Sequence, residues 1–240
     1  MQLPDGAPAG LEVWALPLDL DAPLASEDWA ILSPKEQVRA MRFHRHADRV
    51  RAVRGRASLR RLLESKVGVS ARLLQFSDNE FGKPSLVMPG DAVFSPIEFN
   101  LSHAGAYVLL AMCADAAVGV DVEEREREAD AAALGDYFLS SLERAAGAGI
   151  EAMHRWVAKE SVLKALGLGI ADHLQTYSVV PCGAKDRVAV YRDLDRRTDI
   201  HTWVFDVDAK HVGAVTCIDP PARPAFPGAC ASTSKLQFAR

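Results

Sequence analysis

The chain has 240 residues, of which 49% are hydrophobic and 25% are charged, and its formal net charge is −4. This is enough apolar material for one large domain or two small ones that share an interface, so we expect an ordinary soluble globule. No uninterrupted apolar run approaches the roughly 20 residues that span a bilayer, and the first residues lack the pattern of a secretion signal. We therefore expect a cytoplasmic protein with no membrane partner. The cysteines are far apart and form no C-x-x-C pair, which argues against a zinc site or a disulfide framework: Cys113, Cys182, Cys217 and Cys230.

The charge is unevenly distributed along the chain. Nine arginines lie between Arg39 and Arg61 with a single acid, Asp48, whereas 121–128 holds five acids and two arginines. A basic block and an acidic block suit a metal-phosphate site, although charge runs taken alone are more often solvated helix faces. The basic block contains no aromatic residue beyond Phe43, so we expect no nucleic-acid partner.

The first half is predicted to contain a strand and two helices. Residues 12–20, EVWALPLDL, are typical of a short strand. Ser33 followed by Pro34 indicates a helix start, and we expect that helix to continue through Arg42. Apolar residues at helical spacing then predict a longer, arginine-rich helix that lies on a sheet: Ala52, Gly55, Leu59, Leu62 and Leu63.

Two strands are predicted in the middle of the chain, at Tyr107–Cys113 and Val118–Glu123. The connection between them is short, so we expect adjacent strands in a hairpin that joins the two halves. A long helix should follow from about Ala152 to Leu166 and end at Gly167 or Gly169.

Four further strands are predicted after this helix, with the sequences YSVV, RVAVY, TWVFDV and HVGAVTCI. Each half thus has one long helix and several strands, which predicts a mixed α/β (α+β) fold. The segment 220–240 is rich in Pro, Ala and Ser without periodicity, and we expect it to be a disordered tail.

Asp121 and Glu123 are candidate metal ligands. They lie two positions apart in a predicted strand, so both carboxylates should point to the same face. Two half-buried carboxylates need a cation to offset their repulsion, and Mg²⁺ typically takes one or two carboxylates together with substrate phosphates. A charge pair on an edge strand is the alternative for this common pattern.

Glu160 and Lys164 are spaced i,i+4 on the predicted long helix and should act together. Met153 and Val157 belong to the same stripe, so the charged pair continues an apolar face, which indicates a partly buried site. An ordinary surface ion pair is the alternative.

Two loops could contact a ligand. FNLSHAG places Ser102 and His103 just before a strand, and a protonated His103 could bind phosphate. Adjacent Ser and His rarely have the geometry of a catalytic triad, which argues against a serine nucleophile. FGKP, at residues 81–84, is a turn that presents Lys83.

The order FGKP, FNLSHAG, VGVDVEE and WVAKESVLKALGLG resembles the 4′-phosphopantetheinyl transferase superfamily, of the surfactin-synthetase-activating type. When the flanking arginine-rich helix is included, the resemblance covers about three quarters of the chain. It implies two similar subdomains, each a small sheet packed on a long helix, related by a pseudo-twofold axis. We place the first at 1–116, with the basic helix and both loops, and the second at 117–219, with the metal site.

The resemblance also implies a coenzyme A substrate and a Mg²⁺ cofactor, with Mn²⁺ as an alternative. Asp121, Glu123 and Glu160 would be the metal ligands. Coenzyme A would contact Lys83, Ser102 and His103, particularly through its 3′-phosphate. Arg51 would support the phosphates, and Arg54 or Arg56 could serve in its place.

The implied reaction is attack by a serine of an apo acyl or peptidyl carrier protein on the β-phosphorus of coenzyme A, which releases 3′,5′-adenosine bisphosphate. We expect Glu160 to take the serine proton, directly or through water, and Lys164 to contact the departing phosphate. A metal-dependent hydrolase of coenzyme A or another nucleotide, and a non-catalytic carrier-binding module, are the alternatives. One chain would build the whole cleft, so we expect a monomer.

Overall fold

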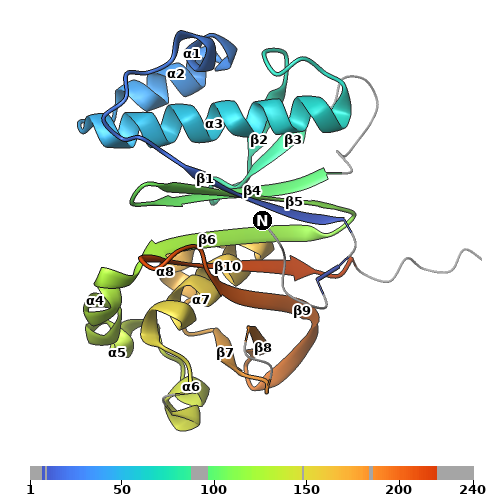
Figure 1. The fold of residues 1–240 in the computed structure, drawn as a ribbon. Coiled ribbons are helices and arrows are strands. Elements are labelled where there is room, and N and C mark those ends of the chain that lie inside the picture. The colour runs from blue at the N-terminus through green and yellow to red at the C-terminus, as the bar shows by residue number, and fades with distance from the viewer. Residues whose placement is uncertain (1–6, 9, 88–96, 148, 184–185, 221–240) are drawn as a thin grey trace, which may run out of the picture.

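The computed structural model describes residues 7, 8, 10–87, 97–147, 149–183 and 186–220. Two antiparallel β-sheets pack on each other at its centre, and a long helix covers the outer side of each sheet (Figure 1). The fold is thus mixed α/β with small antiparallel sheets, as predicted. None of the helices in the described part of the chain is long and apolar enough to cross a membrane.

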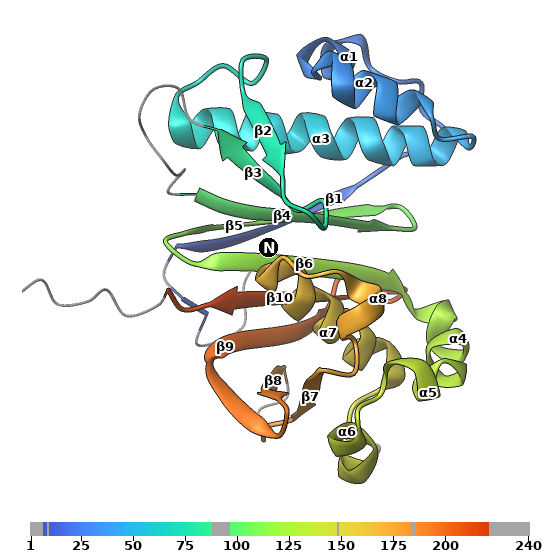
Figure 2. The same cartoon turned by 180° about the vertical axis from the view of Figure 1, so that it is seen from behind.

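The first sheet has the strand order β1–β5–β4 and carries α3 on its outer side. A separate two-stranded hairpin, β2–β3, lies beside α3 (Figure 2). The elements of this half are β1 (Leu11–Pro17), α1 (Ser26–Ile31), α2 (Pro34–Met41), α3 (His46–Val67), β2 (Gln75–Asp78), β3 (Pro84–Val87), β4 (Ile97–Ala104) and β5 (Tyr107–Ala114).

The second sheet has the order β6–β10–β9–β8–β7, and α7 packs on it. Short helices α4 to α6 lie at one end, beyond β6 (Figure 1). The elements of this half are β6 (Ala117–Glu124), η1 (Arg125–Arg127), α4 (Glu128–Ala133), α5 (Gly135–Phe138), α6 (Ser141–Ala146), α7 (Ala152–Leu166), α8 (Ile170–His173), β7 (Tyr177–Pro181), β8 (Arg187–Arg192), β9 (Asp195–Asp206) and β10 (His211–Ile218).

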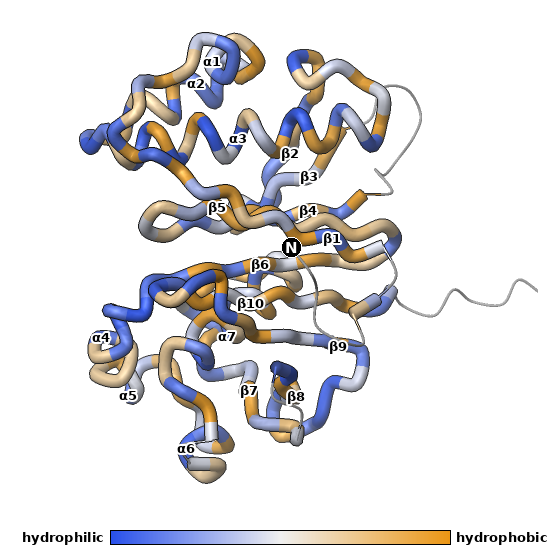
Figure 3. The backbone as a smooth tube through the Cα atoms, in the orientation of Figure 1, coloured by the Kyte–Doolittle hydropathy of each residue, from blue (hydrophilic) through white to orange (hydrophobic). Residues whose placement is uncertain are grey.

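Apolar residues concentrate on the central strands and alternate with polar ones along α3 (Figure 3). One hydrophobic cluster lies between the two sheets and contains side chains of both, including Leu109 of β5 and Val120 of β6. Separate clusters lie under α3 and under α7. The interface between the halves is therefore part of the core.

Local sequence signals set the ends of the helices. Ser33 and Glu36 form a capping box at the start of α2, with Pro34 in the first turn. α7 ends at Gly167, whose φ of 70° is in the left-handed region that glycine tolerates best. Both ends were predicted. β1 begins at Leu11 and ends at Pro17, three residues before the predicted end at Leu20.

The predicted central hairpin is wrong. Both strands form, but β5 lies in the first sheet and β6 is an edge strand of the second. The physical reason is that both strands are buried on two sides: the chain crosses from one packed layer to the other at residues 115–116, where Asp115 adopts a positive φ of 65°. The predicted tail lies almost wholly outside the described residues.

Candidate active site

Three carboxylates converge where α7 packs against β6. Asp121 and Glu123 come from β6, and Glu160 comes from α7. One oxygen atom of each side chain lies within 4.8 Å of the others. Asp121 and Glu160 are buried, with 2% and 8% of their surface exposed. The alternative of an exposed edge-strand pair is therefore excluded for Asp121.

A glycine allows this close approach of helix and strand. A Cβ atom on Gly119 would lie 2.1 Å from the carbonyl oxygen of Ser161 and 2.4 Å from the backbone nitrogen of Ala165. Such distances are far below van der Waals contact, so α7 lies directly on the backbone of β6 only because residue 119 has no side chain. The separation of the acidic residues on the two elements follows from this contact.

Lys164 and Ser102 complete the polar cluster. The ammonium of Lys164 lies 2.5 Å from Asp121 Oδ1 and 3.3 Å from Glu160 Oε2. Ser102 Oγ, on β4 of the first half, donates to Asp121 Oδ1 at 2.7 Å. The Glu160–Lys164 pair is thus part of a buried network, and the alternative of a surface ion pair is excluded.

The electrostatics favour a bound cation. Burial raises the pKa of Glu160 to about 7, and the charge of Asp121 adds to this effect, while Lys164 opposes it. Burial and the charge of Asp121 also raise the pKa of Glu123, against the opposing charge of Arg127. Burial disfavours the ammonium of Lys164, but Asp121 and Glu160 outweigh it and raise its pKa. One lysine thus faces three acids, and the pKa values of Glu123 and Glu160 are raised.

An unpaired atom points to the same conclusion. Asp121 Oδ2 is buried and accepts no hydrogen bond from the described residues. A buried carboxylate oxygen without a partner costs free energy, and a divalent ion would remove that cost. Oxygen ligands alone are the donor set preferred by Mg²⁺ and Mn²⁺. The cluster therefore fits a hard divalent cation.

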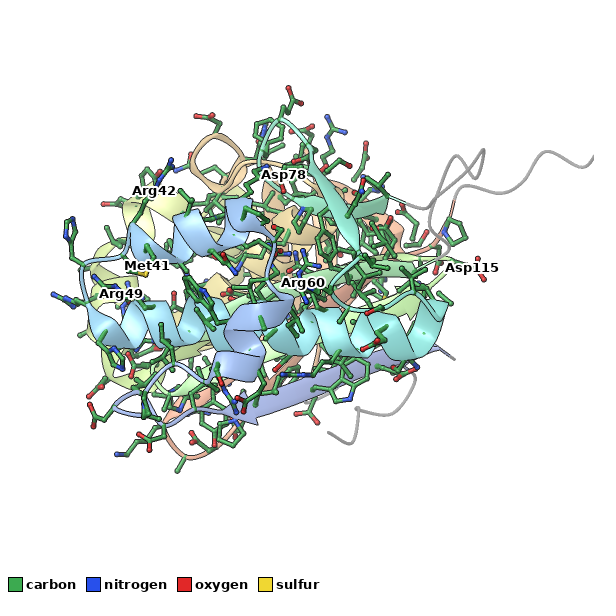
Figure 4. The ribbon with its side chains drawn as sticks, turned by 90° about the horizontal axis from the view of Figure 1, so that it is seen from above. Met41, Arg42, Arg49, Arg60, Asp78 and Asp115 are labelled. Atoms are coloured by element: carbon green, nitrogen blue, oxygen red, sulfur yellow. The ribbon has the colours of Figure 1, made fainter. Side chains whose placement is uncertain are left out.

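A cavity of about 370 Å³ opens beneath α2 and α3. Arg60 and Asp78, both labelled in Figure 4, are among its lining residues. Arg51 and His103 also line it, so two of the predicted phosphate-binding residues meet here. Burial lowers the pKa of His103, and the nearby charges of Arg51 and Lys164 lower it further.

Comparison with known proteins agrees with this geometry. The family described as 4′-phosphopantetheinyl transferase, N-terminal, matches residues 25–115, and the 4′-phosphopantetheinyl transferase superfamily matches residues 117–216. A phosphopantetheinyl transferase of Thraustochytrium sp. is 31% identical over 192 residues, which cover 71% of this chain and 66% of that protein. The 4′-phosphopantetheinyl transferase HetI of Nostoc sp. is 31% identical over 169 residues, which cover 67% of this chain and 70% of HetI. The chain belongs to the 4′-phosphopantetheinyl transferase superfamily.

The transferase Sfp of Bacillus subtilis is also similar, at 26% identity over 171 residues that cover 67% of this chain and 73% of Sfp. The resemblance noted in the sequence thus reflects membership of this superfamily, and the chain is a transferase. The two matched regions meet between β5 and β6, where the chain crosses from one sheet to the other.

The structure of this transferase brings most of the predicted site residues into two groups. The first contains the three acids with Ser102 and Lys164, and the second is the cavity with Arg51 and His103. The prediction that Ser102 and His103 lie in a loop is wrong: both belong to β4, which pairs with β5, so the pleat directs them to opposite faces of the strand. Arg51 donates from Nε to the carbonyl oxygen of Gly105 and pairs with Asp48.

The remaining predicted residues have other partners. Arg54 pairs with Asp28, whereas Arg56 lines the cavity. Lys83 is not among the residues that line the cavity, and its ammonium instead donates to the carbonyl oxygens of Ala165 and Val118.

Two polar residues of the site were not predicted. Arg127 donates to Glu123 at 2.6 Å and holds that carboxylate from its outer side. Asn100 Oδ1 accepts from the backbone N–H of Val120 at 3.0 Å, which joins β4 to β6 next to Asp121. The only sequence signal for Asn100 is its place in FNLSHAG, two positions before Ser102, which puts both on one face of the strand.

Proposed function

We propose that this transferase moves the 4′-phosphopantetheine arm of coenzyme A to a serine of an apo acyl or peptidyl carrier protein, as a member of the surfactin-synthetase-activating type. The observation that carries the proposal is the pairing of a carboxylate cluster with a cationic cavity around one strand, β4. The carboxylate cluster suits a metal-bound diphosphate, and the cationic cavity suits a nucleotide phosphate.

The cavity would hold the nucleotide end of coenzyme A. Its cationic lining side chains, which include Arg39, Arg51 and Arg56, lie near His103, and the ring of Phe43 offers an apolar surface. Several cationic side chains bind a 3′-phosphate more tightly than one does. An adenine ring can pack on an apolar surface. β4 supplies His103 to the cavity and Ser102 to the carboxylate cluster, so we expect a single ligand to contact both sites.

Asp121, Glu123 and Glu160 would hold Mg²⁺, with Mn²⁺ as the alternative. When bound, the ion supplies charge neutralisation at the diphosphate. Arg127 keeps Glu123 in place from outside. Ser102 and Lys164 orient Asp121 through Oδ1, and Oδ2, which accepts no hydrogen bond from the described residues, would face the ion.

The chain's own groups would move the proton. The carrier serine oxygen bonds to the β-phosphorus, and the bond from that phosphorus to the leaving 3′,5′-adenosine bisphosphate breaks. Glu160 would take the serine proton directly or through water, as the general base. Lys164 stabilises the charge on the departing phosphate.

Incubation with coenzyme A, Mg²⁺ and an apo carrier protein tests this function. We expect the carrier to gain the mass of the arm, with 3′,5′-adenosine bisphosphate released in equal amount. Cleavage of coenzyme A with an unmodified carrier would instead identify a hydrolase. Binding of the carrier without cleavage would identify a carrier-binding module. Analytical ultracentrifugation of the protein measures its molecular mass in solution, and we expect that of a monomer.

A further inference from the structure

The turn between β2 and β3 is a rigid support for Lys83. The side-chain oxygen of Asn79 accepts from the backbone N–H groups of Phe81 and Lys83, at 3.0 and 2.9 Å. The backbone N–H of Asn79 donates to the carbonyl oxygen of Lys83, and Gly82 supplies a φ of 83°. The start of the Lys83 side chain is therefore fixed by the turn.

The ammonium of Lys83 donates two hydrogen bonds to backbone carbonyl oxygens and forms one ion pair. It lies 3.0 Å from the carbonyl oxygen of Ala165 and 3.2 Å from that of Val118. The carboxylate of Glu98 lies 3.6 Å away. Two of the three N–H groups of Lys83 thus have backbone acceptors, and the ion pair with Glu98 balances its charge, so a phosphate at Lys83 would compete with that carboxylate. The side chain is 13% exposed, which agrees with an internal role.

The acceptors belong to the two elements that carry the acids. Ala165 is in the last turn of α7, where the carbonyl groups lack helical partners and the helix dipole attracts a cation. Val118 is in β6, three residues before Asp121. Lys83 thus joins α7 to β6 from the other half of the molecule, at the point where Gly119 lets them touch.

Other contacts strengthen this attachment. Asn79 Nδ2 donates to the carbonyl oxygen of Gly167 at 2.9 Å, just beyond the end of α7. The ring of Phe81 lies edge-on to His173 of α8, with centroids 6.3 Å apart. Figure 2 shows the β2–β3 turn reaching toward the second half of the molecule. The turn therefore contacts the C-terminal end of α7 at two places and α8 at a third.

We propose that Lys83 is a positioning residue that fastens α7 to β6, and so sets the spacing of Glu160 from Asp121 and Glu123, and that it is not a phosphate ligand of coenzyme A. The carboxylate spacing governs how tightly a divalent ion is held, and outer partners of metal ligands typically change metal affinity or activity roughly 10–100-fold. The activity part of this inference depends on the proposed function, whereas the metal-binding part does not.

The variant Lys83→Met keeps the aliphatic stem and removes the three donors. We expect Mg²⁺ affinity, measured by calorimetry, and kcat to fall by roughly 10-fold or more. The preference for coenzyme A over 3′-dephospho-coenzyme A, measured as a ratio of kcat/KM values, should stay unchanged. A ligand of the 3′-phosphate would behave in the opposite way: the preference would collapse while Mg²⁺ affinity stayed the same, and that result would overturn the proposal.

Three further variants make the test specific. Arg56→Met, in the cavity, should reduce the preference for coenzyme A without changing Mg²⁺ affinity. Lys66→Met removes an exposed partner of Glu12 and should change neither quantity. Asn79→Ala keeps the Lys83 ammonium but removes the side-chain hydrogen bonds that hold the turn and the contact with Gly167, and it should lower Mg²⁺ affinity in the same direction as Lys83→Met.

The outcomes remain separable from those of the proposed function. If Lys83→Met does not fold, Asn79→Ala and the milder Lys83→Gln decide the question, and unchanged Mg²⁺ affinity in both would contradict the proposal. If the unaltered protein modifies no carrier, the proposed function fails, and Mg²⁺ calorimetry still tests the positioning role.

Discussion

The buried, acidic environment of Glu160 destabilises its ionised form, which lowers the stability of the metal-free protein. It is buried beside Asp121, and its pKa is raised to about 7. Glu160→Gln should lower the rate of carrier modification by about 10²–10⁴-fold, because the variant lacks the proton acceptor. Mass spectrometry of carrier samples taken over time measures this, and near-normal rates at saturating Mg²⁺ would contradict both roles given to Glu160.

The same substitution should stabilise the metal-free protein. The folded state holds the Glu160 proton more tightly than the unfolded chain, whose glutamate titrates near 4.5. Wild-type stability without metal therefore falls as the pH rises from 4.5 to about 7, and the Gln variant lacks this loss. Urea unfolding in EDTA should show a gain of about 1–3 kcal/mol at pH 8 and little difference at pH 4.5. An equal gain in unfolding free energy at pH 4.5 and pH 8 would show that the effect comes from packing and not from ionisation of Glu160.

A second buried charge pair supports the helix that carries Glu160. Lys159 and Glu143 are 2.5 Å apart, and both side chains are fully buried. Glu143 also accepts from the backbone N–H groups of Ser140 and Val179, one at each oxygen, so Glu143→Gln removes the charge and can keep only one of those two bonds. We expect a loss of about 3–5 kcal/mol, because the ammonium of Lys159 then lacks a counter-charge.

The double variant Glu143→Gln, Lys159→Met provides the control for this pair. It removes the stranded ammonium and should regain much of the lost stability in urea unfolding. Simple additivity of the two single losses would show that the pair does not couple the helices.

Candidate site residues that lie close together in the sequence were easier to predict than residues whose partners are distant in the sequence. Spacing along one strand and one helix made Asp121, Glu123, Glu160 and Lys164 candidates, and the family resemblance implied that they share one site. The arginine-rich block was not resolved in this way: Arg54 and Arg61 pair with Asp28, and Arg60 pairs with Glu36. These acids lie 24 to 33 residues away, and no local pattern marks them. Some arginines of α3 therefore form structural ion pairs and others line the cavity, and only the fold shows which do which.

At the scale of elements, periodicity and caps predicted the helices, but not which strands pair. The sequence marks β5 and β6 as strands and marks the short connection between them. A short connection usually means a hairpin. Here the two strands are apolar on both faces, and the chain places them in different layers, where more of that surface is buried. Strand pairing is a property of the whole core, so local signals did not determine it.

Gly119 is the contact point between elements on which the acid cluster depends. Gly119→Ala should push α7 away from β6, since the new Cβ would meet backbone atoms that cannot rotate aside. We expect a loss of stability of about 1–3 kcal/mol or more and weaker Mg²⁺ binding. Gly135→Ala, whose nearest neighbour would be a Leu139 methyl at 3.3 Å, should leave Mg²⁺ binding unchanged. Thermal unfolding with and without Mg²⁺ measures both, and a normal Mg²⁺ response of the Gly119 variant would contradict this account of the site.

At the scale of the molecule, the two halves divide the site between them. All three acids belong to the second half, while the cavity is lined by α2, α3 and strands of the first. Figure 4 places Arg42 and Arg49 at one end of the first half and Asp115, where the chain crosses between the halves, at the other. The sequence predicted two halves with a long helix each. The resemblance implied that the basic helix and the metal site lie in different halves, but local sequence signals did not show that the acid cluster and the cavity would meet around β4.

This division predicts that metal and nucleotide binding can be lost separately. Ala52 of α3 lines the cavity, so Ala52→Trp should fill much of its 370 Å³ and abolish detectable binding of coenzyme A in calorimetry. The stabilisation by Mg²⁺ in thermal unfolding should persist, because its carboxylates lie on β6 and α7. Ala47→Trp places the same side chain on the same helix outside the cavity, and it should bind coenzyme A normally. If Ala52→Trp also lost the Mg²⁺ response, the two sites would be one cooperative unit, and coenzyme A binding to Ala52→Trp would place the nucleotide elsewhere.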